Sequence, residues 1–208
     1  MRRALLLSAA VVAGCAGAAR LSRADLVGTT WREVCPAPEI ATAYARLDAD
    51  GEVVLLRDQD RSRWDAEAIA EGRRLLARAL AIRRVGPYQL QAAIAGAHAS
   101  APTFDDTDWR TIRRLYAVLA RLEPSPVVAL NEAVAAALSE GPESGLALLS
   151  PIAEELDGYH YFHLARADML ATTGERDAAR AAFDRALELC GSEAERRAIR
   201  RVAAEKLA

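Results

Sequence analysis

Apolar residues recur at helical spacing through residues 64–206 of this 208-residue chain, in segments separated by short turns that contain Gly or Pro. The hydrophobic fraction is 52%, but only 5% of the residues are aromatic, and this bias toward Ala, Leu and Val favours helix. Short turns make successive helices antiparallel neighbours. The pattern therefore predicts an all-α fold of antiparallel helix pairs, with eight helices over residues 64–84, 88–99, 107–122, 127–138, 142–156, 159–173, 175–189 and 193–206.

A period is visible among these segments. Gly141 and Gly174 are 33 residues apart, each at the bend between two helices of a pair. After Gly174, small and aromatic residues stand at the spacing that a tetratricopeptide repeat uses to pack its two helices closely: Ala179, Phe183 and Ala186, with Ala167 in the helix before. The sequence thus predicts a TPR-like helical repeat array over residues 46–208. Because a solenoid usually needs three or more units, the earlier helices are expected to stack as degenerate pairs.

The segment before the first helix is unusually charged. Six of the nine side chains in residues 57–65 are charged, around one tryptophan. Such a cluster contacts a partner protein, forms an internal clamp in which Arg61 or Arg63 pairs with an acidic residue at 105, 106 or 108, or does both. Ser62 and Thr107 are the expected helix N-caps. The candidate residues for these roles are Asp58, Asp60, Arg61, Arg63, Trp64 and Asp65, with Trp109 as a second aromatic anchor.

The first 45 residues differ from the remainder and are expected to form an irregular N-terminal segment. Arg2 and Arg3 precede an uncharged stretch from Ala4 to Ala19, as in a secretory signal. Residues 12–15 resemble a bacterial lipobox, which makes Cys15 a candidate for lipidation. The alternatives are a short apolar helix and a wrongly chosen start codon. The run is shorter than the roughly 20 residues of a transmembrane helix.

No motif in the chain indicates catalysis, a cofactor or a metal. The serines lie at turns, caps or helix surfaces, and the glycines form no phosphate-binding loop. The three cysteines are far apart and lack CxxC spacing. His160 and His163 are one helical turn apart, but the spacing supplies no further ligands. We expect Tyr159, His160 and His163 to pack on a neighbouring helix or to line a partner surface. A formal net charge of -2 also argues against binding to nucleic acid.

Ten segments from residue 48 onward occur together in the order found in one group of proteins, at residues 48–56, 58–65, 69–72, 86–95, 97–99, 107–109, 122–131, 159–160, 165–168 and 194–197. They resemble the C-terminal tetratricopeptide-like extension of extracytoplasmic-function RNA polymerase sigma factors. Most recognisable are Asp-Gln-Asp-Arg at 58–61, Gly-Pro-Tyr at 86–88 and Leu-Glu-Pro-Ser-Pro at 122–126.

The resemblance implies a cytoplasmic regulatory domain that contacts a sigma factor, core RNA polymerase or a signalling protein. The first 45 residues show neither of the promoter-reading domains of such factors, so direct DNA binding by this chain is not expected. The alternative, motivated by the lipobox, is a lipid-anchored helical-repeat scaffold outside the cytoplasmic membrane.

Overall fold

The computed structural model describes residues 46–47 and 52–208 of the chain. That part is helical apart from two very short strands, β1 (Arg46–Leu47) and β2 (Val53–Val54), which pair antiparallel. The predicted irregular segment 1–45 lies outside the described residues. The predicted all-α class is confirmed, with α3 (Ala66–Ala81), α4 (Pro87–Ser100), α5 (Trp109–Leu122), α6 (Pro126–Glu140), α7 (Pro142–Leu149), α8 (His160–Thr173), α9 (Arg176–Leu189) and α10 (Glu193–Leu207).

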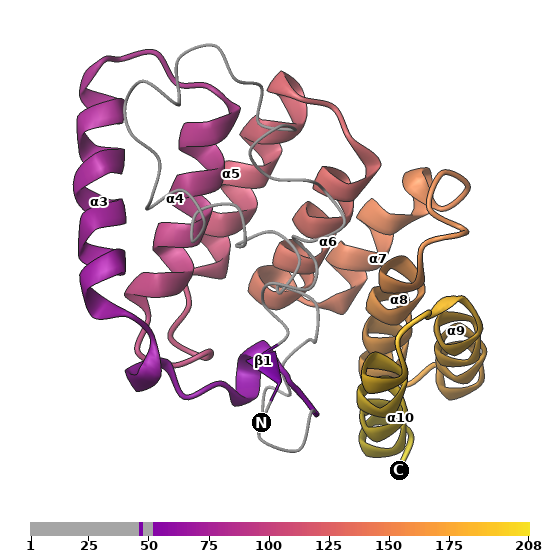
Figure 1. Cartoon of the computed structure of the whole chain (residues 1–208). Coiled ribbons are helices and arrows are strands. Elements are labelled where there is room, and N and C mark those ends of the chain that lie inside the picture. Colours follow the sequence, from indigo (N-terminus) through magenta and orange to yellow (C-terminus); the bar gives the residue numbers. More distant parts are fainter. Residues whose placement is uncertain (1–45, 48–51) are drawn as a thin grey trace.

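Each helix packs against its neighbours in the chain, so that the array runs from α3 at one end to α9 and α10 at the other (Figure 1). The turns at Gly141 and Gly174 adopt φ angles of 118° and 91°, which L side chains rarely reach. Gly174 ends α8 in the left-handed conformation, and its N–H donates to the Ala171 carbonyl oxygen at 3.3 Å. The two glycines that are 33 residues apart thus have the same role, since each ends a helix and lets the chain reverse direction.

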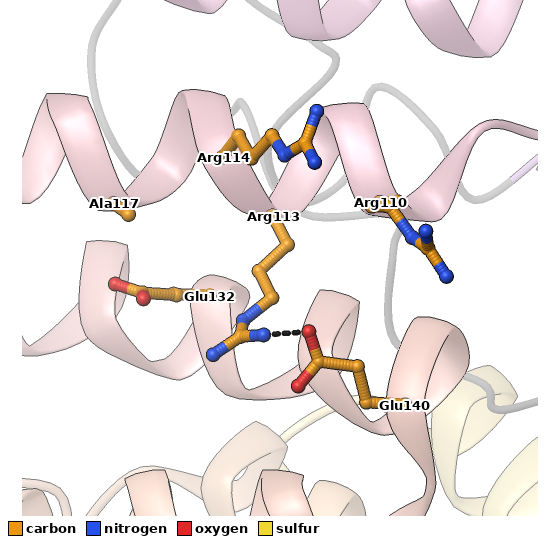
Figure 2. A pocket seen from close by; sticks show the side chains of 6 residues that line it. All are labelled: Arg110, Arg113, Arg114, Ala117, Glu132 and Glu140. Atoms are coloured by element: carbon orange, nitrogen blue, oxygen red, sulfur yellow. Dashed lines mark hydrogen bonds and ion pairs between the residues drawn. The ribbon is translucent and has the colours of Figure 1, made fainter.

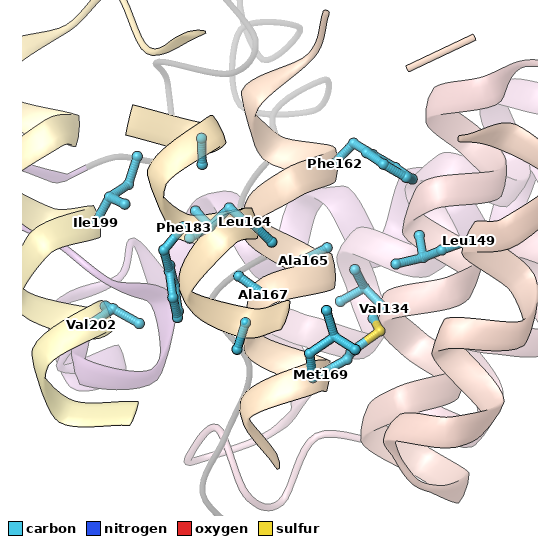
Figure 3. Packing of buried hydrophobic residues seen from close by; sticks show 14 of the residues in the cluster. Val134, Leu149, Phe162, Leu164, Ala165, Ala167, Met169, Phe183, Ile199 and Val202 are labelled. Atoms are coloured by element: carbon cyan, nitrogen blue, oxygen red, sulfur yellow. The ribbon is translucent and has the colours of Figure 1, made fainter. Parts of the chain in front are cut away.

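Two hydrophobic cores lie side by side in the array. The larger core joins α6 to α10, and the small residues Ala167, Ala179 and Ala186 are buried in it. Figure 3 shows Ala167 and Phe183 among the side chains of this core. The smaller core joins α4, α5 and one residue of α6. Leu55 belongs to the larger core and the adjacent Leu56 to the smaller one. The segment 52–65, which we call the strap, therefore contributes to both.

Two expected N-caps need correction. Asp65, rather than Ser62, caps α3, since its Oδ1 accepts the Ala68 N–H at 2.9 Å. Ser62 lies instead in a 3-10 turn, η5 (Arg61–Arg63), and donates to Asp60. Asp108 caps α5 by accepting the Thr111 N–H at 3.0 Å, which leaves the neighbouring Thr107 hydroxyl for another contact.

The fifth helix is shorter than expected. The pattern predicts a helix over 142–156, but α7 ends at Leu149. It is followed directly by the short 3-10 helix η6 (Ser150–Ile152). Pro151 contributes to this end because it has no N–H to donate to the preceding turn, although Ser150 before it keeps right-handed α angles, with φ −56° and ψ −47°.

Candidate functional site

Arg61 fastens the strap to the end of α4. Its guanidinium donates to the carbonyl oxygens of His98 and Ala101 at 2.8 and 3.0 Å and to the Thr107 hydroxyl at 3.2 Å. These carbonyls belong to a helix C-terminus, where unsatisfied acceptors and the helix dipole favour a cation. Burial lowers the pKa of Arg61, and the charge of Asp106 opposes this shift. Arg61 is thus half-buried, and its guanidinium is bound to acceptors of the fold.

The sequence predicts that Arg61 or Arg63 pairs with an acidic side chain at 105, 106 or 108, and the described part of the structure has a different arrangement. Among the described residues, no ion pair within 4.0 Å joins Arg61 or Arg63 to a carboxylate at 105, 106 or 108. Carbonyl and hydroxyl oxygens hold Arg61 instead, and Arg63 is exposed. Sequence reasoning could not find backbone acceptors, because any residue supplies them.

The other residues of the charged cluster serve separate purposes. Asp60 and Asp65 cap η5 and α3. Trp64 lies beneath the Arg61 guanidinium, 5.0 Å from the ring centre, and packs on the smaller core. Trp109 is buried between His98 and Phe104, with ring centres 5.1 and 5.0 Å apart. Asp58 is exposed and lies 3.6 Å from Arg57.

The strap also contacts the opposite end of the array. Arg57 pairs with Glu205 of α10 at 2.5 Å, and Glu52 pairs with Arg197 at the same distance. Arg201 donates to the Val53 carbonyl oxygen at 3.0 Å. One short segment is therefore joined to α4 through Arg61 and to α10, nearly 150 residues further on in the sequence.

His98 lies at the centre of the Arg61 contact. It is 1% exposed, and burial, helped by the Arg61 charge, lowers its pKa to about 3. The folded protein therefore holds His98 neutral, whereas the unfolded chain takes up a proton below pH 6.5. Stability is lost as the pH falls through this window, at about 1.4 kcal/mol per pH unit.

We expect His98→Gln to remove this part of the pH dependence. Urea unfolding at pH 7.5 and 5.5 should show a difference in the free energy of unfolding that is about 1 kcal/mol smaller in the variant than in the wild type. An equal loss in both proteins would show that His98 does not carry the effect.

The two histidines near 160 do not share a site. The His163 ring Nε2 lies 2.7 Å from the Asp157 carbonyl oxygen, which occupies it. His160 faces Cys190 and Glu195 instead, while Tyr159 packs at the edge of the larger core. Cys190 and Glu195 were missed by sequence reasoning, since they lie 30 or more residues from His160.

A shallow pocket of about 300 Å³ lies between α5 and α6. Arg113 at its centre pairs with Glu140, whereas Arg110 and Arg114 extend away from this pair (Figure 2). Burial raises the pKa of Glu132, which also lines the pocket, and the positive charge of Arg113 opposes this shift. Side chains of both charges line the pocket, and the pair between Arg113 and Glu140 joins α5 to α6. This mixture of charges does not favour the binding of an anion.

The terminal helix α3 exposes apolar side chains. The sequence predicts an amphipathic helix with Ile69, Leu75, Leu76, Leu80 and Ile82 on one stripe, but the structure divides this stripe. Ile69 and Leu76 are partly buried near α4, whereas the others face solvent. Five large apolar residues between positions 75 and 88 are 43–69% exposed. What we call the α3 surface consists of Leu75 and Leu80 on α3, Ile82 at its C-cap, Val85 in the following turn and Tyr88 at the start of α4.

Comparison with known proteins shows that the chain is similar to one protein family and to one protein of a bacterium. A family of unknown function, DUF6596, matches residues 39–80, which include the strap and nearly all of α3. Over this segment, the chain is similar to that family. The uncharacterized protein R00370 of Rhizobium meliloti (strain 1021) is 49% identical over 158 residues, or 76% of this chain.

The chain spans 37% of the length of the Rhizobium protein. No solved structure matches the sequence significantly. In the part of the chain that the structure describes, no helix combines the length and hydrophobicity required to cross a membrane. Cys15, the candidate lipidation site, lies outside the described residues.

Proposed function

We propose that this chain is a protein-interaction and regulatory domain of a sigma-factor-like protein that acts in transcription initiation. The ordered motifs of residues 48–197 support this proposal, and so does the similarity to part of a much longer protein. Its partners would be promoter-binding domains of a sigma factor, core RNA polymerase or a signalling protein. It would act by binding, without catalysis and without contacting DNA itself.

The α3 surface is the observation that carries the proposal. Large exposed apolar side chains that follow one another along a helix and the turn after it typically mark a protein interface, since each loses contact with water when a partner covers it. Leu75 and Ile82, the C-cap of α3, are two helical turns apart, and Ile82 keeps right-handed α angles, so both lie on the same side. Arg78 and Arg84 add charge nearby, which gives the surface a mixed, interface-like composition.

The inner side of α3 is already used. Arg73 donates to the Ala99 carbonyl oxygen at 3.2 Å and to the Ser100 hydroxyl at 3.0 Å, which fixes α3 on α4. The exposed side chains of α3 therefore stand on a helix that the fold holds in place. A partner meets a preformed surface, which lowers the entropic cost of association.

We expect substitution of this surface to weaken binding without unfolding the chain. Leu75→Glu/Ile82→Glu should reduce affinity at least about thirtyfold, as loss of interface anchors commonly does. The titrants are purified core RNA polymerase and the part of the Rhizobium protein outside the 158 matched residues. Affinity is measured by calorimetry or surface-immobilised binding, and wild type is expected to bind one of the two.

A matched control is present in the same chain. Leu122 and Val127 are exposed as well, near the turn between α5 and α6. Leu122→Glu/Val127→Glu introduces the same charges on another surface and should leave the affinity unchanged. Failure of the wild-type chain to bind either titrant, or equal weakening by both double variants, would contradict the proposal.

A further inference from the structure

Three metal-ligating side chains meet where α8, α9 and α10 come together. His160 is the first residue of α8, Cys190 is the C-cap of α9, and Glu195 lies in the first turn of α10. Their ligand atoms all lie within 4.8 Å of one another. The Glu195 Oε2 is 4.0 Å from the His160 Nε2 and 3.7 Å from the Cys190 Sγ.

Two of the three groups in this cluster, His160 and Cys190, lack close partners for their ligand atoms. The His160 Nε2 is buried and makes no hydrogen bond to any described residue. Cys190 is 0% exposed, and its thiol has only long contacts, to the Ser192 carbonyl oxygen and to Glu195. A buried polar atom without a partner is costly, so the arrangement is incomplete as it stands.

The carboxylate is oriented from outside the cluster. The Tyr161 hydroxyl donates to the Glu195 Oε1 at 2.5 Å, which leaves Oε2 directed at the other two groups. Such hydrogen bonds to the second oxygen of a ligating carboxylate are common around metal sites, where they fix the ligand in place.

We propose that His160, Cys190 and Glu195 form a binding site for a divalent transition metal, best suited to zinc. Imidazole nitrogen, thiolate sulfur and carboxylate oxygen are all ligands that zinc accepts in tetrahedral geometry. Zinc–ligand bonds of about 2.0–2.3 Å place tetrahedral ligands roughly 3.3–3.7 Å apart, so modest closure of the cluster suffices. The fourth position is taken by water.

Charge and protons balance at such a site. The Cys190 thiol releases its proton to solvent as the sulfur binds the metal, and His160 binds through its neutral imidazole. The thiolate and the carboxylate together neutralise the two positive charges of the ion. The site would fasten the start of α10, the helix that also carries the strap contacts of Arg197 and Glu205. The proposal does not depend on the sigma-factor-like function.

Cobalt(II) is the probe for this site, because a tetrahedral cobalt–thiolate complex absorbs through sulfur-to-metal charge transfer. Cys15→Ser/Cys35→Ser leaves Cys190 as the single thiol of the full chain. We expect saturation of this absorption at one equivalent of cobalt and its loss when zinc is added. Circular dichroism verifies that each protein is folded.

Variants then assign the ligands. In the same background, Cys190→Ser should abolish the absorption. His160→Gln or Glu195→Gln should weaken cobalt binding at least about tenfold. Tyr161→Phe should also weaken cobalt binding about tenfold, because it removes the hydrogen bond that orients Glu195. The controls His163→Gln and Glu193→Gln remove a neighbouring imidazole and a neighbouring carboxylate and should change nothing. Absence of the absorption from the folded protein, or binding that is unaffected by His160→Gln and Glu195→Gln, would overturn the proposal.

Discussion

Lys206→Met is expected to lower the free energy of unfolding by about 3–5 kcal/mol. The Lys206 ammonium lies 2.8 Å from the Asp168 carboxylate, with side chains that are 4% and 0% exposed. Neither group has a hydrogen bond to any other described residue. Burial raises the pKa of Asp168, and the Lys206 charge opposes this shift. Removing the ammonium leaves a buried carboxylate with no compensating charge in contact, which must either remain charged at high cost or take up a proton.

The double variant separates the cost of an unpaired charge from the value of the pair. Asp168→Leu/Lys206→Met replaces both charges with apolar groups and should lie within about 1 kcal/mol of wild type or above it. Urea unfolding of the two single variants and the double variant measures the coupling. A loss below about 1 kcal/mol in Lys206→Met would show that the pair is solvated and that α10 is held by other contacts.

Arg61→Ala should be the second most damaging substitution, with a loss of about 3 kcal/mol. The guanidinium satisfies two carbonyl oxygens at the end of α4 and the Thr107 hydroxyl, and truncation leaves these acceptors without their charged donor. Trp64 also loses the cation above its ring. Urea unfolding provides the measurement.

Arg63 is the matched control, two residues away on the same turn. It is exposed, so Arg63→Ala should change stability by less than about 0.5 kcal/mol. Arg61→Lys keeps the charge but loses the planar fork that reaches three acceptors at once, and should recover only part of the stability. Equal effects of Arg61→Ala and Arg63→Ala would mean that the strap is not fastened at this point.

The helices were predictable because their signals are local. Periodicity placed eight helices, and Gly86, Gly141 and Gly174 with the prolines at 87, 126 and 142 marked their ends to within a few residues. Glycine acts through positive φ or small size, and proline through its missing N–H, without reference to distant parts of the chain. The one large boundary error, at 149–156, followed from giving Pro151 too little weight.

The strap and the candidate sites were less predictable because they depend on distant contacts. The sequence predicted a clamp formed by Arg61 or Arg63 and an acidic residue, but the acceptors of Arg61 include backbone atoms some 40 residues away. The Arg57–Glu205 pair joins residues that are 148 positions apart, and Cys190 meets His160 only when α8, α9 and α10 pack. The exposure of Leu75 and Ile82 was hidden as well, since amphipathic spacing does not reveal which apolar side chains a neighbouring helix covers.

A run-off transcription assay tests the proposed role in transcription most directly. A chimaera carries this chain in place of the matched 158 residues of the Rhizobium protein, and is mixed with core RNA polymerase and pooled genomic fragments before the transcripts are sequenced. We predict promoter-specific transcripts from the chimaera, fewer with Leu75→Glu/Ile82→Glu, and no change with Leu122→Glu/Val127→Glu. If neither the chimaera nor the Rhizobium protein itself produces a promoter-specific transcript, the assignment to transcription initiation is contradicted.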